Sequence, residues 1–150
     1  MKKQNLIHLY TAEGEKLSEQ PWNVYPRPQM VRNSFLCLNG EWQLGENGKI
    51  TVPFVPEALL SGINKRQKRL CVLNYFKDFT LPDGFKRDRV LLHFGAISRS
   101  ASIKLNGHDL GEFHGGYTPI SIDVTDYLED TNRLDVLCVN SMFDQSYPYG

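Results

Sequence analysis

Asn-Gly pairs divide this sequence into short segments, and they constrain its fold more than any other feature. The pairs are Asn39-Gly40, Asn47-Gly48 and Asn106-Gly107. Asn-Gly is the strongest two-residue signal for a β-hairpin, because both residues tolerate a positive φ. Apolar residues flank each pair in short runs or in alternation with polar ones, which is typical of β-strands.

The apolar pattern predicts about eight to ten short strands at intervals of roughly 8–12 residues, the rhythm of an antiparallel β-sandwich or jelly roll. The expected strand segments are 34–38, 41–44, 50–54, 73–82, 89–97, 101–105, 120–128 and 132–143. Segment 89–97 is almost continuously apolar, as a central strand buried on both faces would be. No alternation of strands and helices occurs, so a parallel sheet is not expected.

Little helix is expected. Pro56 would open a short helix over 56–60, and Thr125 would cap a single turn within Val124–Glu129. Residues 1–20 are polar and weakly patterned, and they predict a mobile or loosely docked arm before a domain at 21–150.

The charge balance argues against nucleic acid and membrane surfaces as partners. The chain has 17 Lys and Arg against 17 Asp and Glu, whereas phosphate binding requires a basic excess. The basic stretch Lys65–Arg69 is therefore interpreted as a solvated loop. No segment approaches the ~18 apolar residues of a membrane helix, and the first 20 residues lack the apolar core of a signal peptide.

The three cysteines favour a reducing, cytoplasmic setting. Cys37, Cys71 and Cys138 are odd in number, lack CxxC spacing and lie in or beside apolar segments. We interpret them as buried free thiols.

No motif for catalysis, metal or cofactor binding is found in the sequence. His108 and His114 lack an evident third ligand, and His93 is interpreted as a packed or paired imidazole within a strand. Asp123 is expected to accept backbone hydrogen bonds at the following turn and not to act in catalysis. Gly115-Gly116 predict a tight turn, since no helix follows them as in a phosphate-binding loop.

Aromatic residues near turns give the better indication of binding, because sugars stack on aromatic rings. These residues are Trp22, Tyr25, Trp42, Tyr117, Phe143, Tyr147 and Tyr149. Trp42 is expected in the core. Trp22 lies in a proline-flanked segment, which it would pin to the sandwich or to a neighbouring domain.

Several stretches, taken in order, resemble the N-terminal sugar-binding domain of family 2 glycoside hydrolases, nearest to the β-galactosidase-like and β-glucuronidase-like members. The stretches are "PRPQMVRNSFLCLNGEWQL", "ITVPFVPEALLSGI", "YFKDFTLP", "RVLLHFGAISRSASIKLNGHDLGEFHGGYTPISIDVTDYL" and "LDVLCVNSMFDQSYPYG", which together cover about residues 26–150. The resemblance implies a jelly-roll sandwich of the galactose-binding-like type. It also implies that the two catalytic glutamates lie on a separate (β/α)₈ barrel, beyond an immunoglobulin-like domain, and that this chain is non-catalytic.

The resemblance further implies partners and an incomplete sandwich. The partners are a terminal β-linked carbohydrate, the remaining domains of a parent glycosidase and a second copy in a homo-oligomer. The family pattern continues past "YPYG" into strands that complete the sandwich, so a jelly roll lacking its last strands is expected here. Such an edge would be exposed, which predicts strand exchange, dimer formation or modest stability.

Two loops are the counterparts of the family's sugar-contacting segments, about 60–70 and 140–147. Within them Asn64, Asp144 and Gln145 are expected to hydrogen-bond sugar hydroxyls. Asn140 stands where the family pattern has an acid. Two functions remain open: a carbohydrate-binding accessory domain, and a structural scaffold that binds no sugar alone. A self-sufficient enzyme is disfavoured, because no acid pair or triad is evident.

Overall fold

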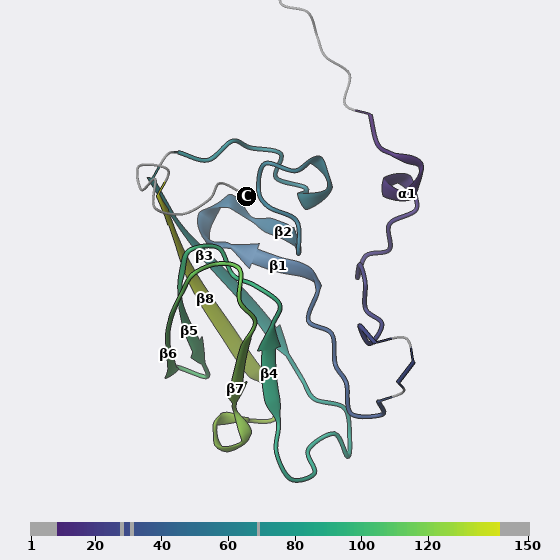
Figure 1. Ribbon diagram of the computed structural model, residues 1–150, viewed down its shortest axis with the longest axis vertical. Helices are drawn as coiled ribbons and strands as arrows, with labels where there is room; N and C mark the ends of the chain where they lie inside the picture. The colour runs from purple at the N-terminus through teal and green to yellow at the C-terminus, as the bar shows by residue number, and fades with distance from the viewer. Residues whose placement is uncertain (1–8, 28, 31, 69, 142–150) are drawn as a thin grey trace, which may run out of the picture.

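The computed structural model describes residues 9–27, 29–30, 32–68 and 70–141 (Figure 1). This part of the chain forms eight strands and one short helix, α1 (Ala12–Glu15). The strands are β1 (Gly40–Leu44), β2 (Lys49–Val52), β3 (Leu70–Phe79), β4 (Leu91–Phe94), β5 (Ser100–Leu105), β6 (His108–His114), β7 (Ile120–Asp123) and β8 (Asn132–Ser141).

All strand pairs are antiparallel, which confirms the predicted all-β galactose-binding-like sandwich. Among the described residues, one sheet has six strands in the order β2-β1-β3-β8-β5-β6, and the other consists of β4 and β7. The centre of the large sheet is the β3–β8 ladder, in which ten residues of each strand pair from Leu70↔Ser141 to Phe79↔Asn132.

The core lies between the two sheets, because alternate side chains of each strand point inward. Ala101, Ile103 and Leu105 of β5 are buried, as their spacing predicts. The β4–β7 pair lies across this inner face (Figure 1) and packs partly buried Phe94 and Ile122 against it.

Asn106-Gly107 is confirmed as a two-residue hairpin turn, whereas Asn47-Gly48 lies in a hairpin with a longer connection. Asn106 and Gly107 have φ of 52° and 81° and link the paired residues Leu105 and His108 in a two-residue hairpin. Asn47 and Gly48 belong to the β1–β2 connection, where a 3₁₀ turn spans Gly45–Asn47 and the Leu44 amide donates to the Gly48 carbonyl at 2.8 Å.

The prediction for Asn39-Gly40 is wrong, since residues 34–38 form no strand and Gly40 already begins β1. The Asn39 amide donates to the Pro21 carbonyl at 3.0 Å, and the Gln20 amide donates to the Cys37 carbonyl at 2.7 Å. Side chains and backbone of the N-terminal segment therefore bind residues 37–39 in place of a hairpin partner. Gly40 fits that close approach, because an added Cβ would lie 3.0 Å from the Glu19 carbonyl oxygen.

Segment 89–97 is not a central strand. Its strand, β4, pairs only with β7 among the described residues, and its side chains alternate between exposed and half-buried. His93 is exposed, which excludes the packed alternative of the expected packed or paired imidazole. The reason is that a two-stranded sheet covers the core with one face and leaves the other open to solvent.

The two helical predictions are corrected in detail. A 3₁₀ turn at Leu59–Ser61 replaces the helix expected over 56–60. A 3₁₀ turn does occur at Thr125–Tyr127, but Val124 holds the cap position and makes no side-chain cap. Instead the Thr125 hydroxyl accepts a hydrogen bond from the Val90 amide at 2.9 Å, which ties the turn to the segment that leads into β4.

The cysteines are free in the described part of the chain: Cys138 is buried, while Cys37 and Cys71 are half-buried. Lys65, Arg66 and Lys68 are exposed, as a solvated loop requires. None of the helices formed by the described residues has the length and apolar character needed to cross a bilayer.

Candidate functional site

One end of the six-stranded sheet gathers the loops predicted to contact a sugar. Leu70, the first residue of β3, pairs with Ser141, the last residue of β8. Ser100, the first residue of β5, pairs with both Val139 and His114. The segments before β3, before β5 and after β6 therefore meet the end of β8. We call residues 62–68, 95–99, 115–119 and 140–141 the loop end.

Asn64 is held in a fixed turn and is exposed. Its φ is 46°, a left-handed conformation that Asn tolerates better than most residues. The buried Ser61 hydroxyl donates to the Ala58 carbonyl at 2.7 Å and accepts from the amides of Ile63 and Asn64 at 3.0 and 3.5 Å. The turn thus presents the Asn64 side chain to solvent from a backbone that Ser61 anchors.

Asp144 and Gln145, the other two residues predicted to contact a sugar, lie outside the described residues. The neighbouring Asn140 is described, and its side-chain oxygen accepts a hydrogen bond from the Ser98 hydroxyl at 2.9 Å. The amide oxygen of Asn140 accepts the hydrogen bond that the carboxylate of the family pattern could also accept, but Asn140 carries no charge. The Ser98–Asn140 pair joins the end of β8 to the loop before β5.

A row of polar side chains continues from this pair along the outer face of β5 and β6. The Ser100 hydroxyl lies 2.9 Å from Nδ1 of His114, and the Ser102 hydroxyl donates to Glu112 at 3.4 Å. Glu112 contacts Ser102 and not the imidazole, so these side chains do not form a nucleophile–base–acid relay.

The Gly115-Gly116 turn follows β6 at the loop end. The prediction of a tight turn at these two glycines is confirmed. The two glycines have φ of 123° and 76°. The Gly115 amide donates to the Arg99 carbonyl at 2.8 Å, and a Cβ on Gly116 would lie 2.8 Å from the Arg99 nitrogen. Arg99 is itself left-handed, with φ of 52°.

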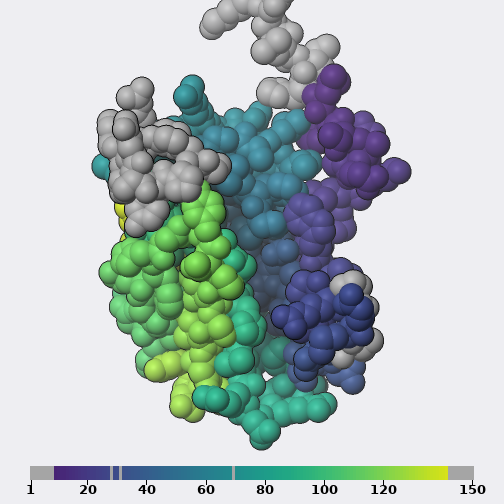
Figure 2. Space-filling view, in the orientation of Figure 1, coloured from purple at the N-terminus to yellow at the C-terminus, as the bar shows by residue number. Residues whose placement is uncertain are grey.

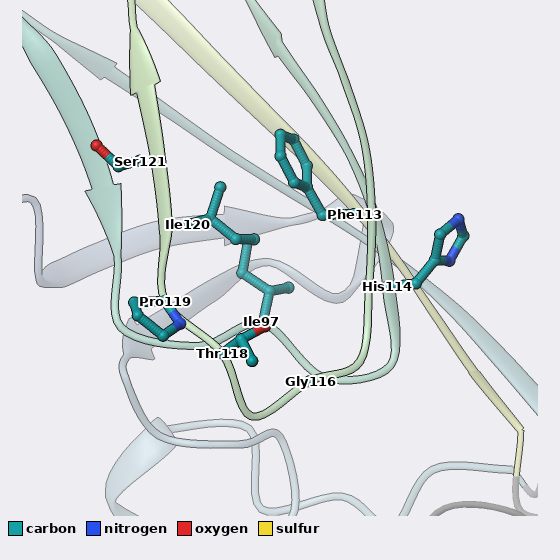
Figure 3. Close-up of a pocket in the computed structure, with 8 residues that line it drawn as sticks. All are labelled: Ile97, Phe113, His114, Gly116, Thr118, Pro119, Ile120 and Ser121. Atoms are coloured by element: carbon teal, nitrogen blue, oxygen red, sulfur yellow. The ribbon is translucent and has the colours of Figure 1, made fainter.

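A cavity of about 210 Å³ lies between this turn and β7 (Figure 3). Its lining residues are Ile97, Phe113, His114, Gly116, Thr118, Pro119, Ile120 and Ser121. Ile97, Phe113 and Ile120 lie together, whereas the His114 ring points away from them (Figure 3). The cavity is smaller than the roughly 300–1,000 Å³ of pockets for drug-sized ligands, so it suits at most a single small ring.

Asp123 lies at the far end of β7 and has a structural role, as predicted. Its carboxylate accepts hydrogen bonds from the Thr125 hydroxyl and from the Thr125 amide at 3.1 Å, and Arg89 donates to it at 2.8 Å. The Thr125 bonds, with a smaller contribution from Arg89, hold the pKa of Asp123 below its ordinary value. No group of three or more His, Cys, Asp or Glu in the described ranges is placed to hold a metal ion.

The two tryptophans differ in their exposure to solvent. Trp42 is 6% exposed and its indole N–H donates to the Leu38 carbonyl at 2.7 Å, which confirms its place in the core. Trp22 is 61% exposed, but its ring lies 5.4 Å from that of Phe54, which follows β2. It therefore contacts the sandwich while most of its surface stays open, and the adjacent Pro21 is fully buried.

The sequence predicted Asn64 in an exposed loop, which the structure has, but it did not single out Ser98, Arg99 or Ser100, which also lie at this end of the sheet. The serines lie in "SRSAS", which carries no recognised motif. The sequence drew attention to Asn140, because it stands where the family pattern has an acid. It did not indicate that Asn140 bonds Ser98, which lies 42 residues away in the chain.

Comparison with known proteins supports the resemblance. The model of the glycosyl hydrolase 2 galactose-binding domain-like family matches residues 41–146. The β-galactosidase of Thermoanaerobacter pseudethanolicus is 34% identical over 65 residues, which are 43% of this chain and 9% of that protein. The β-glucuronidase of Streptococcus agalactiae is 25% identical over 132 residues, which are 81% of this chain and 22% of that protein.

The same fold occurs in solved structures. The β-glucuronidase from Ruminococcus gnavus in complex with C6-substituted uronic isofagomine superposes with a TM-score of 0.60 at 19% identity, over 83% of this chain and 24% of that one. The chain therefore corresponds to less than a quarter of the length of each of these relatives. By the match over residues 41–146, it belongs to the glycosyl hydrolase 2 galactose-binding domain-like family.

Proposed function

We propose that this chain is a non-catalytic carbohydrate-recognition domain of a family 2 glycosidase, and that its loop end contacts a terminal β-linked sugar. The observation that supports this most is the pairing of Leu70 with Ser141, because the loop that carries Asn64 leads into Leu70 and Ser141 ends β8. The names of the relatives, β-galactosidase and β-glucuronidase, suggest the substrate class of the whole protein.

The chemistry of the loop end suits hydroxyl recognition. Asn64, Ser98 and Asn140 offer amide and hydroxyl groups that donate and accept hydrogen bonds. The apolar side chains of the cavity suit the C–H face of a sugar ring. In this proposal the domain contributes contacts to the sugar, Asp144 and Gln145 add further hydrogen bonds, and the glycosidic bond is broken by another part of the protein.

An NMR titration of the chain with galactose, glucuronic acid and mannose tests this function. We expect saturable shifts at the amides of 62–68 and at the side-chain amides of Asn64 and Asn140. Asn64→Ala and Asn140→Ala should weaken binding, whereas Asn74→Ala, an exposed amide within β3, should not. A folded sample without shifts at high millimolar sugar would reject sugar recognition at this site.

A structural scaffold is the second candidate, because apolar side chains line the outer face of the large sheet. Val72 and Val139 lie directly opposite each other on β3 and β8 and are 60% and 37% exposed. Leu70 and Leu137 extend this strip and are also exposed. Such a strip is typical of a surface that another protein surface covers.

We propose a second copy of the chain as the occupant in this alternative, in line with the expected homo-oligomer. Light scattering at increasing concentration should then show a dimer that the double variant Val72→Thr and Val139→Thr abolishes. A stable monomer at all concentrations would argue against the scaffold role and against the expected strand exchange.

The free thiols support a further proposal, that the protein resides in the cytoplasm. Burial, and to a lesser degree the neighbouring Cys71, raises the pKa of Cys138 to about 11. Thiols that persist in reduced form are typical of reducing compartments. Fractionation of the source cells with compartment markers would test this localisation.

A further inference from the structure

The N-terminal segment, at the purple and blue end of the chain, lies on the surface (Figure 2). It carries an exposed tryptophan, Trp22. Trp22 is 61% exposed, ten times more than Trp42 in the core. Exposure of so large an apolar ring is unfavourable in water, and exposed aromatic residues of this kind often mark binding sites.

The backbone beneath this ring is fixed. Pro21 is fully buried, and its carbonyl accepts from the Asn39 amide at 3.0 Å. The Cys37 thiol lies 3.7 Å from the Trp22 carbonyl oxygen, which accepts from it. Trp22 has φ of 51°, a left-handed conformation that is unfavourable for a non-glycine residue. The flanking contacts hold the residue in this conformation and so fix the base of the side chain.

A second aromatic ring, from a different part of the chain, supports the indole. Phe54 follows β2, and its ring centroid lies 5.4 Å from that of Trp22 with the planes tilted by 51°. The Phe54 amide donates to the Thr51 carbonyl at 3.1 Å, which fixes the start of this segment. A ring held by such a pair loses little entropy when a ligand stacks on it.

Neutral polar side chains lie close to Trp22 in the chain. Asn23 is exposed, and its amide donates to the Gln20 side-chain oxygen at 3.4 Å. Gln20 is in turn bonded to the Cys37 carbonyl at 2.7 Å. An apolar ring face beside neutral amides suits a ligand with C–H groups on one face and hydroxyls at its edge, and it offers little to an anion.

We infer that Trp22, supported by Phe54 and flanked by Asn23, is a stacking platform for a neutral pyranose ring of a β-linked glycan. The platform goes beyond the proposed function, because it uses none of the loop-end residues. It would add a second contact with the same polysaccharide or oligosaccharide. Stacking of a ring face on Trp22 would supply most of the affinity, and the Asn23 amide would bind a hydroxyl.

The test uses the indole N–H signals of the chain, of which there are two because it has two tryptophans. Trp22→Phe assigns the signals. With methyl β-galactoside and with lactose, the Trp22 signal should move saturably while the Trp42 signal stays in place. Trp22→Ala should weaken binding by about tenfold, and Asn23→Ala by less. Val24→Ala, which removes an exposed apolar side chain beside the platform, is the matched control and should leave the affinity unchanged.

The outcomes separate this site from the loop end. Movement of the Trp22 signal without shifts at 62–68 supports the platform and rejects the loop end, and the reverse result overturns the platform. Equal affinity of Trp22→Ala and the unaltered chain also overturns it. A Trp22 signal that responds to protein concentration but not to sugar would show a protein-docking residue and would overturn the inference as well.

Discussion

Gly116 packs against the backbone of Arg99 so closely that no side chain fits between them. A Cβ on Gly116 would lie 2.8 Å from the Arg99 nitrogen and 3.5 Å from the Ser98 Cα. The contact brings the turn after β6 onto the loop before β5, which carries the Ser98–Asn140 hydrogen bond. Packing at a glycine therefore sets the shape of the loop end.

Gly116→Ala should lower the free energy of unfolding by roughly 2–4 kcal/mol, because it adds a backbone clash to the cost of a left-handed alanine. Urea denaturation measures the change. Gly48→Ala is the matched control, since Gly48 also has a positive φ of 87° but no atom lies within 4 Å of its added Cβ. The control should cost only about 1 kcal/mol, and equal losses in the two variants would refute the steric argument.

Ser61→Ala should loosen the turn that presents Asn64. The buried hydroxyl bonds the Ala58 carbonyl and the Ile63 amide, and its removal should cost about 1–2 kcal/mol. Hydrogen exchange should speed up at the amides of Ile63 and Asn64. Ser18→Ala, which removes an exposed hydroxyl bonded to the Gln20 carbonyl, should leave those amides protected. Unchanged exchange in Ser61→Ala would show that the turn does not depend on this side chain.

Asp123 should make stability depend on pH in the acid range. Its native pKa lies below the ordinary value of 3.8 because of the Thr125 hydrogen bonds and Arg89. The carboxylate therefore contributes stability above pH 3.8, and this contribution is lost as the pH falls through the native pKa. Asp123→Asn should be less stable than the unaltered chain at neutral pH, and the difference should vanish in acid. Asp83→Asn, at an exposed site, controls for net charge; a difference that persists in acid would contradict the assignment.

Cys138 should react slowly with a thiol reagent. With a pKa of about 11, only about a thousandth of this thiol is ionised at pH 8, against roughly a quarter of an ordinary cysteine. A variant that keeps only Cys138 should react at least about a hundredfold more slowly when native than in urea. A variant that keeps only the half-buried Cys37 is the comparison. Equal native and denatured rates for Cys138 would show that burial does not protect it.

Local sequence was sufficient to predict the parts of the fold that depend on neighbouring residues. The alternation of Ala101, Ile103 and Leu105 predicted their burial, and Asn106-Gly107 predicted its hairpin. Asn39-Gly40 carried the same signal but failed, because its partner is Pro21, 18 residues earlier in the chain. A contact at that separation leaves no trace in a local pattern.

In the candidate site, too, local features were predictable from the sequence and long-range contacts were not. Asn64 could be placed in an exposed loop from its polar surroundings. Ser98 could not be linked to Asn140, since the bond joins residues 42 apart and depends on the register of β5 and β8. The strand positions were predictable from periodicity, but the pairing order β3-β8-β5 was not. That order, and not any single strand, creates the loop end.

The β3–β8 ladder separates two regions that can change independently. Ten paired residues span about 30 Å at the rise of an extended strand. At one extremity Asn132 of β8, with its side chain bonded to Asn106 and to the backbone of Glu129, closes the sandwich. At the other, Leu70 and Ser141 open into the loops. Loops of different length and composition can therefore be accommodated at the second extremity without disturbing the contacts that close the sandwich at the first.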